Sequence, residues 1–285
     1  MINAKRSILA RSAPLLAGAA ALHSAHAQLI PGDPNSPAAK IRLLSDTATL
    51  APGQSAWLAI EFDIAPKWHI YWPGQNDSGY APSVDWTHPE EITIGPIIWP
   101  GPRRYVMPGP ILDHTYEGRV LLLTQLTTST DLKPGTDIAL HARLEWLECE
   151  DGCVPRDGEL SLRLPVVPDS PTPSADAPSI ATARAALPKD PGNALRVEWS
   201  SSTEVVLTPM PPGAPSIARI AFYPHESGIE IINPLKHAEA RAASITLPLA
   251  EPDADKPHLK GILECWDDTG KPVALWIVDI PRPRN

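Results

Sequence analysis

Hydrophobic and polar residues alternate along much of the chain, with the period of two that is typical of half-buried β-strands. Residues 56–64 follow this pattern, and residues 136–146 repeat it with an apolar side chain at every second position. Both segments therefore predict strands. The other strands that the pattern indicates span residues 41–50, 92–99, 119–127, 159–166, 195–199, 204–208, 217–223, 228–232, 243–249, 259–266 and 273–280.

A proline-rich segment divides this β pattern into two parts. Residues 168–178 are rich in Pro, Ser and Asp, as linkers are, and residues 179–187 predict one short helix that Pro188 ends. The 35 prolines of the chain favour short strands joined by turns. We therefore expect an all-β protein with two β-sandwich domains, residues 28–167 and 193–285, joined by a linker at 168–192.

The first 27 residues have the layout of a secretory signal peptide. Three basic residues precede an apolar run at residues 13–22, and Ala-His-Ala at 25–27 forms a small-x-small cleavage site. The run is too short to cross a bilayer, and no later segment reaches the ~20 apolar residues of a membrane helix. We expect cleavage after Ala27 and an exported protein without membrane insertion.

Charge and export narrow the range of partners. Cleavage would remove three basic residues and no acidic one, which takes the formal net charge from −9 to −12. A chain this acidic is unsuited to nucleic acid or anionic lipid, so neither is expected as a partner. In an oxidising compartment, two neighbouring cysteines normally form a disulfide, and one of the 3 cysteines is then left over.

Cys149 and Cys153 lie in an acidic turn between two predicted strands, which places them at the tip of an antiparallel hairpin with a loop of about a dozen residues. An extended chain advances ~3.3 Å per residue, so the segment must fold back before the two can bond. So small a ring would stabilise the fold by only ~2 kcal/mol, against ~4–5 kcal/mol for a ring of 100 residues. A weak link in a loop suits a bond that is broken and re-formed.

A purely structural disulfide is the first alternative for this pair, and zinc is the second. One CxxxC motif supplies two zinc ligands and no second pair completes four, while haem attachment would need CxxCH. We therefore expect no metal and no cofactor other than a redox-active disulfide. Glu148, Glu150 and Asp151 disfavour a thiolate, which predicts a slow attacking thiol. The disulfide can still be attacked by the thiolate of a partner.

Three other residues and one segment bear on the site. His69 and Tyr71 occupy alternate positions and so face the same side of one strand; the alternative is that they are surface aromatic residues on a sheet. Cys265 lies in an apolar strand and is expected to be buried and inert, with an intermolecular disulfide as the alternative. Residues 100–110 contain Gly and Pro repeatedly and predict an irregular loop.

Residues 144–155, LEWLECEDGCVP, resemble the active-site loop of the periplasmic N-terminal domain of the thiol:disulfide interchange protein DsbD, and in particular its ScsB-like branch (suppressor of copper sensitivity). Residues 71–82 (YWPGQNDSGYAP), 116–122 (YEGRVLL) and 260–263 (KGIL) resemble the same branch. The likeness covers most of the chain after residue 27. Its specific parts are the cysteine loop and residues 71–82.

This resemblance implies an immunoglobulin-like β-sandwich followed by a second, smaller β-sandwich, in the periplasm. It implies thiol-disulfide exchange, in the context of copper tolerance or cytochrome c biogenesis. By position, Cys153 would form the mixed disulfide with a partner and Cys149 would resolve it. His69 and Tyr71 would lie beside the pair, and Tyr105 would belong to the segment that shields it.

The resemblance also implies the partners. Thioredoxin-like periplasmic oxidoreductases would receive the electrons. Family members continue into membrane helices, which are not found in this sequence, so we expect a separately encoded membrane protein as the electron donor. The chain would then be a component of a protein-disulfide reductase. The alternative is a non-catalytic periplasmic binding module with a structural Cys149–Cys153 disulfide, active in copper or metal-stress handling.

Overall fold

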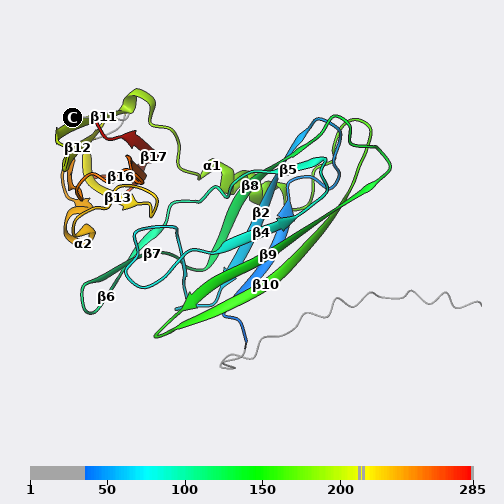
Figure 1. The fold of residues 1–285 in the computed structure, drawn as a ribbon, viewed down its shortest axis with the longest axis horizontal. Coiled ribbons are helices and arrows are strands. Elements are labelled where there is room, and N and C mark those ends of the chain that lie inside the picture. The colour runs from blue at the N-terminus through cyan, green and yellow to red at the C-terminus, as the bar shows by residue number, and fades with distance from the viewer. Residues whose placement is uncertain (1–35, 211–212, 214–215, 284–285) are drawn as a thin grey trace, which may run out of the picture. The chain divides into compact units, whose positions relative to one another are not determined.

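Antiparallel strand pairing builds nearly the whole of the computed structural model (Figure 1), which describes residues 36–210, 213 and 216–283. The expected all-β class is confirmed. The predicted signal peptide, residues 1–27, lies outside the described residues. From Pro37 onward, the described residues belong to one compact unit.

Three sheets form the first half of this unit. The sheets of order β1-β2-β8-β5 and β10-β9-β4 face each other across a shared apolar core. In that core the rings of Phe62 and Trp146 meet edge to face, with centroids 5.7 Å apart. The third sheet, β3-β7-β6, is smaller. The strands are β1 (Ala39–Ser45), β2 (Ser55–Ile64), β3 (Ile70–Tyr71), β4 (Ser83–Thr87), β5 (Ile92–Ile94), β6 (Arg103–Met107), β7 (Ile111–Tyr116), β8 (Arg119–Thr128), β9 (Asp137–Cys149) and β10 (Cys153–Pro165).

The second half contains two sheets, of order β11-β12-β15 and β14-β13-β16-β17, around a core of its own. Tyr223, Ile262 and Trp266 from this half also contribute to the core of the first half. The two halves are therefore joined by side-chain packing as well as by the chain. The elements are η1 (Gly192–Ala194), β11 (Leu195–Ser201), β12 (Glu204–Pro209), β13 (Ile217–Pro224), α2 (Pro234–His237), β14 (Glu239–Ala240), β15 (Ile245–Pro248), β16 (His258–Asp267) and β17 (Pro272–Pro281).

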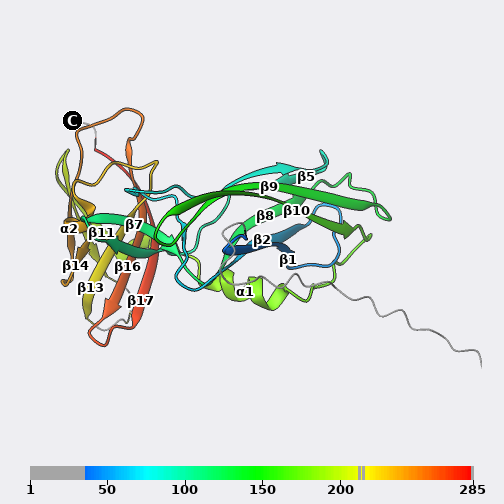
Figure 2. The same cartoon turned by 90° about the horizontal axis from the view of Figure 1, so that it is seen from below.

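The short helix expected between the two β patterns is present as α1 (Ala177–Ala185). Pro178 lies in its first turn, where the missing N–H removes no helical hydrogen bond. Figure 2 shows α1 on the outer face of the β1-β2-β8 sheet, and Ile180 of this helix is fully buried with Leu44, Ala59, Leu121 and Leu123 of the sheet. Among the described residues, no helix has the length and apolar character needed to cross a membrane.

Residues 100–110 are not the irregular loop that their Gly and Pro content predicts. Arg103–Met107 form β6, which pairs with β7 from Arg103↔Thr115 to Met107↔Ile111. The strand has five residues and lies between Pro102 and Pro108, where the missing N–H of proline does not interrupt a ladder. The strand was not predicted because prolines on either side of it are also typical of loops.

The predicted dozen-residue loop between the cysteine hairpin strands is also wrong, because β9 and β10 continue to Cys149 and Cys153 and leave three residues between them. Alternation stops at Trp146, since the strand is buried on both faces from Trp146 to Cys149. Of residues 92–99, only Ile92–Ile94 form a strand. Residues 228–232 form no strand, and Ile231 makes one isolated bridge to Leu249.

Candidate functional site

A disulfide joins Cys149 and Cys153 where β9 and β10 end, at the free tip of their hairpin (Figure 1). The two residues are directly opposite in the ladder, with their Cα atoms 4.2 Å apart. The backbone N–H and C=O of Cys149 both bond to His69 on the other side of the strand. The Cys149–Cys153 pair is therefore a non-hydrogen-bonded pair, in which opposite Cα atoms approach to about 4.5 Å. Strand register alone brings the two cysteines within bonding reach.

The two cysteines differ in their exposure. Cys149 is 2% exposed, because its strand lies between β10 and the segment that carries His69. Cys153 is exposed, because β10 is the edge strand of its sheet. A group that approaches from solvent therefore meets Cys153 first.

Tyr71 places a hydroxyl beside both sulfur atoms. Its side chain is fully buried, and its hydroxyl donates to Cys149 Sγ at 3.1 Å and lies 3.4 Å from Cys153 Sγ. Burial raises the pKa of the phenol, so it stays protonated and able to donate at neutral pH. Gly79 covers the ring, and a Cβ at that position would collide with it.

A network of hydrogen bonds holds the loop after β3 in place. Asp113 of β7 is fully buried and accepts from the backbone N–H groups of Asp77 and Ser78 at 2.9 and 3.0 Å. The Ser78 hydroxyl donates to the same carboxylate at 2.5 Å and lies 3.4 Å from the Tyr71 hydroxyl. No local pattern in the sequence indicates Asp113, because it lies 35 positions after Ser78 and only the β3–β7 pairing brings the two together.

His69 lies beside Tyr71, as their alternate positions predict, with ring centroids 5.3 Å apart. It is 1% exposed, so the alternative of a surface aromatic residue is wrong for both side chains. Burial lowers the pKa of His69, against the opposing charges of Asp113 and Glu117. The ring is therefore neutral near pH 7, and it brings no positive charge to the sulfur atoms.

Tyr105 reaches this group from β6. Its ring packs on that of His69, with centroids 4.5 Å apart. Tyr105 is half-buried, and its strand is the edge of the β3-β7-β6 sheet. The structure thus brings Tyr105, His69, Tyr71 and the disulfide into one continuous set of contacts.

Glu148, Glu150 and Asp151 occupy different environments. Glu148 is fully buried and accepts from the N–H groups of Ala38 and Ala39 and from Arg156 Nε at 2.7 Å. Neighbouring residues of a strand face opposite sides, so this carboxylate points away from the adjacent sulfur. Glu150 and Asp151 lie in the tip itself, half-buried and exposed respectively. Glu148 is therefore placed as a structural anchor of β1.

Cys265 is fully buried in the core of the second half. Burial raises the pKa of this thiol to about 12, and the Glu264 carboxylate adds to the shift. It is the free cysteine of the described residues and has the character expected of an inert core thiol. Within the same described ranges, no group of three or more His, Cys, Asp or Glu is arranged to hold a metal ion.

An immunoglobulin-like β domain with a cross-strand disulfide at a hairpin tip is the class that this geometry defines. Residues 41–165 match the family model of the N-terminal domain of the thiol:disulfide interchange protein DsbD, so this part of the chain is similar to that domain. The fold is also that of the N-terminal periplasmic domain of ScsB from Proteus mirabilis, with a TM-score of 0.57, 18% identity, and coverage of 88% of this chain and 96% of that chain. The predicted resemblance is confirmed.

Other solved structures show less similarity. The periplasmic chaperone SfaE has a TM-score of 0.22 at 8% identity, over 82% of this chain and 98% of that one. Spo0M, a sporulation control protein from Bacillus subtilis, has a TM-score of 0.26 at 10% identity, over 87% and 91%. No curated protein sequence matches the chain.

Proposed function

We propose that this chain is a periplasmic thiol-disulfide exchange protein that passes reducing equivalents through Cys149 and Cys153 to thioredoxin-like partners. The observation that carries the proposal is the asymmetry of the pair, in which one sulfur is exposed and the other is buried against a hydroxyl donor. A bond with a structural role alone gains nothing from this arrangement. The match of residues 41–165 to the family model of the DsbD N-terminal domain supports it.

Reduction of the pair would begin at the exposed sulfur. A thiolate of the electron donor attacks Cys153 Sγ, the Cys149–Cys153 bond breaks, and its electron pair leaves on Cys149 Sγ. A second thiolate of the donor then attacks the donor's own sulfur in the mixed disulfide and releases Cys153. The donor loses two electrons and two protons, and the pair gains both.

Transfer to a client follows the same steps in reverse. The Cys153 thiolate attacks the disulfide of the client, and Cys149 then attacks Cys153 to release the reduced client. Tyr71 supports both directions, because its hydroxyl can donate to the Cys149 thiolate. This thiolate is the leaving group when the pair is reduced and the attacking group when the client is released. His69 is neutral and Cys149 is buried, so we expect a dithiol that reacts with a docked partner rather than with stray oxidants.

The reason for slow self-activation matches the one that the sequence indicates only in part. Of the acidic neighbours that disfavour a thiolate, Glu148 faces away and is paired with Arg156, whereas Glu150 and Asp151 lie in the tip. Desolvation of Cys149 in an apolar cluster with Tyr71 and Leu147 has the same effect. The exposed thiol of Cys153 is left as the attacking group.

Trapping tests the proposal. The Cys149→Ser protein is mixed with a thioredoxin-like protein that keeps only its exposed active-site cysteine, activated as its thionitrobenzoate disulfide. Cys153 displaces thionitrobenzoate, and we expect a stable mixed disulfide on Cys153, seen by non-reducing electrophoresis and mass spectrometry. Cys153→Ser is the matched control, because its remaining Cys149 is buried and should trap little. A reduction potential below about −300 mV, together with no trapping, would instead support the structural disulfide of a binding module.

A further inference from the structure

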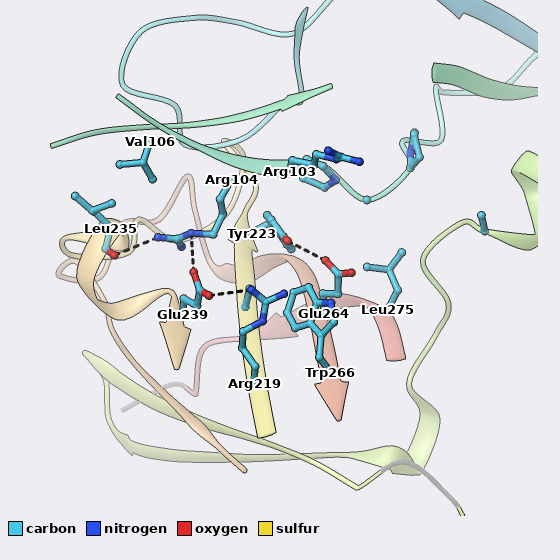
Figure 3. A pocket seen from close by; sticks show the side chains of 15 residues that line it. Arg103, Arg104, Val106, Arg219, Tyr223, Leu235, Glu239, Glu264, Trp266 and Leu275 are labelled. Carbon is cyan, nitrogen blue, oxygen red and sulfur yellow. Dashed lines mark hydrogen bonds and ion pairs between the residues drawn. The ribbon is translucent and has the colours of Figure 1, made fainter. Parts of the chain in front are cut away.

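The strand that carries Tyr105 has a second contact, with the other half of the protein. Side chains alternate along β6, so Tyr105 lies on His69 while its neighbour Arg104 projects the opposite way. Arg104 enters a cleft of about 800 Å³ between β6 and the sheet of β13, β14 and β16 (Figure 3). The two faces of one short strand thus connect the disulfide site to the second half.

Arg104 is firmly held in this cleft. Its guanidinium donates to the carbonyl oxygens of Leu235 at 3.1 Å and Pro234 at 3.5 Å, and it pairs with Glu239 at 3.3 Å. The side chain is only 11% exposed. A guanidinium stays charged at neutral pH, and a buried charge is stable only while it is paired. Moving β6 away from the second half would therefore leave this charge without partners.

The polar groups of the cleft bind one another. Glu239 also pairs with Arg219 at 3.3 Å, and Arg219 lies over the Trp266 ring at 3.6 Å. Tyr223 donates to Glu264 at 2.8 Å. Figure 3 shows Arg104 reaching from β6 to Glu239, while the other pairs lie within the wall formed by β13, β14 and β16. Because these polar groups are already paired, and Arg104 joins β6 to the opposite wall, the cleft is better described as a clamp than as a site that awaits a ligand.

We propose that Arg104 is a positioning residue through which the second half holds Tyr105 over the His69–Tyr71 side of Cys149. The inference rests on the proposed function, since it assigns a shield to the same exchange site. β6 is an edge strand that pairs with β7 alone in its sheet, so it can lift without breaking another ladder. The second half then controls access to the buried sulfur.

Alkylation of Cys149 tests the shield without any redox partner. In a Cys153→Ser background, the rate at which iodoacetamide modifies Cys149 is followed by peptide mass mapping, which separates it from Cys265. We expect Arg104→Ala to raise this rate about fivefold or more, the lower end of couplings between distinct sites. Glu239→Ala, on the opposite wall, should act in the same direction. Arg103→Ala is the matched control, because Arg103 is exposed and makes no side-chain hydrogen bond or ion pair within the described residues.

A double-mutant cycle distinguishes positioning from general loosening. If Arg104 acts through Tyr105, Arg104→Ala adds no further acceleration once Tyr105→Ala is present. Equal acceleration in both backgrounds, or none in either Arg104→Ala or Glu239→Ala, would overturn the proposal. These outcomes do not depend on trapping by Cys153, so failure of the clamp and failure of the exchange function give different results.

Discussion

The Tyr71 hydroxyl contacts both sulfur atoms of the disulfide, so its hydrogen bond can follow the negative charge when the S–S bond breaks. A hydrogen bond to a charged group contributes about 1.5–3 kcal/mol, more than one to a neutral group. The benefit should therefore be larger for the Cys149 thiolate than for the disulfide. Tyr71 would favour the reduced state and speed its formation.

Replacing Tyr71 with Phe removes the hydroxyl and keeps the buried ring. We expect the rate of reduction by a small dithiol to fall about tenfold, which corresponds to ~1.4 kcal/mol of lost stabilisation. Stopped-flow measurement of thiol release would show the change. Tyr80→Phe is the matched control, since that side chain is 54% exposed and lies nine residues along. Equal rates for wild type and Tyr71→Phe would exclude the hydroxyl from the exchange.

Because side chains alternate along β9, the neighbours Glu148 and Cys149 face opposite sides of the strand and have different roles. Cys149 faces Tyr71, and Glu148 faces Ala38, Ala39 and Arg156, where its carboxylate ties the start of β1 to the hairpin. The structure thus assigns Glu148 to stability and leaves the reactivity of the sulfur to other groups. The two effects can be measured separately.

Glu148→Ala should lower the free energy of unfolding by about 3 kcal/mol, because it removes the buried carboxylate that pairs with Arg156 and accepts from two backbone N–H groups. Urea denaturation measures this loss. The rate of reduction by a small dithiol, compared under conditions where both proteins are folded, should stay near that of wild type. Glu145→Ala is the control, since Glu145 is an exposed residue of the same strand. A faster reduction with an unchanged free energy of unfolding would mean that Glu148 controls the reactivity of the disulfide and not the stability of the fold.

Much of the site follows from local pattern, and the rest depends on pairing between distant strands. The hairpin tip and the shared face of His69 and Tyr71 come from spacing within ten or so residues. Asp113 and Tyr105 enter the site through β7 and β6, whose pairing no local period reveals. Proline and glycine around β6 resemble loop signals, although they also border short edge strands.

At the scale of the whole molecule, the two halves meet around His114. Its ring lies between Trp72 of the first half and Tyr223 of the second, with centroids 6.0 and 5.9 Å away. Nδ1 lies 3.0 Å from Asn76 Oδ1, and Nε2 has no hydrogen-bond partner within the described residues. The two predicted sandwiches therefore share a buried, titratable contact that could not be located from either pattern alone.

Protonation of His114 should loosen this contact in acid. Burial, with the nearby Arg104 charge, lowers the pKa of His114 from 6.5 to about 3. Between these values the unfolded chain binds a proton that the folded protein does not, so stability is present above pH 6.5 and is lost as the pH falls. The loss attributable to one such histidine is about 1.4 kcal/mol per pH unit.

We expect the free energy of unfolding, measured with urea at pH 7 and pH 5, to fall with acid in the wild type and to fall less steeply in His114→Gln. Some pH dependence will remain, because burial also lowers the pKa of His69 and His225. His141→Gln is the control, since that side chain is exposed on β9 and bonds only to Ser161 among the described contacts. If the free energy of unfolding of His114→Gln depended on pH as steeply as that of wild type, protonation of His114 would not be a cause of the loss of stability in acid.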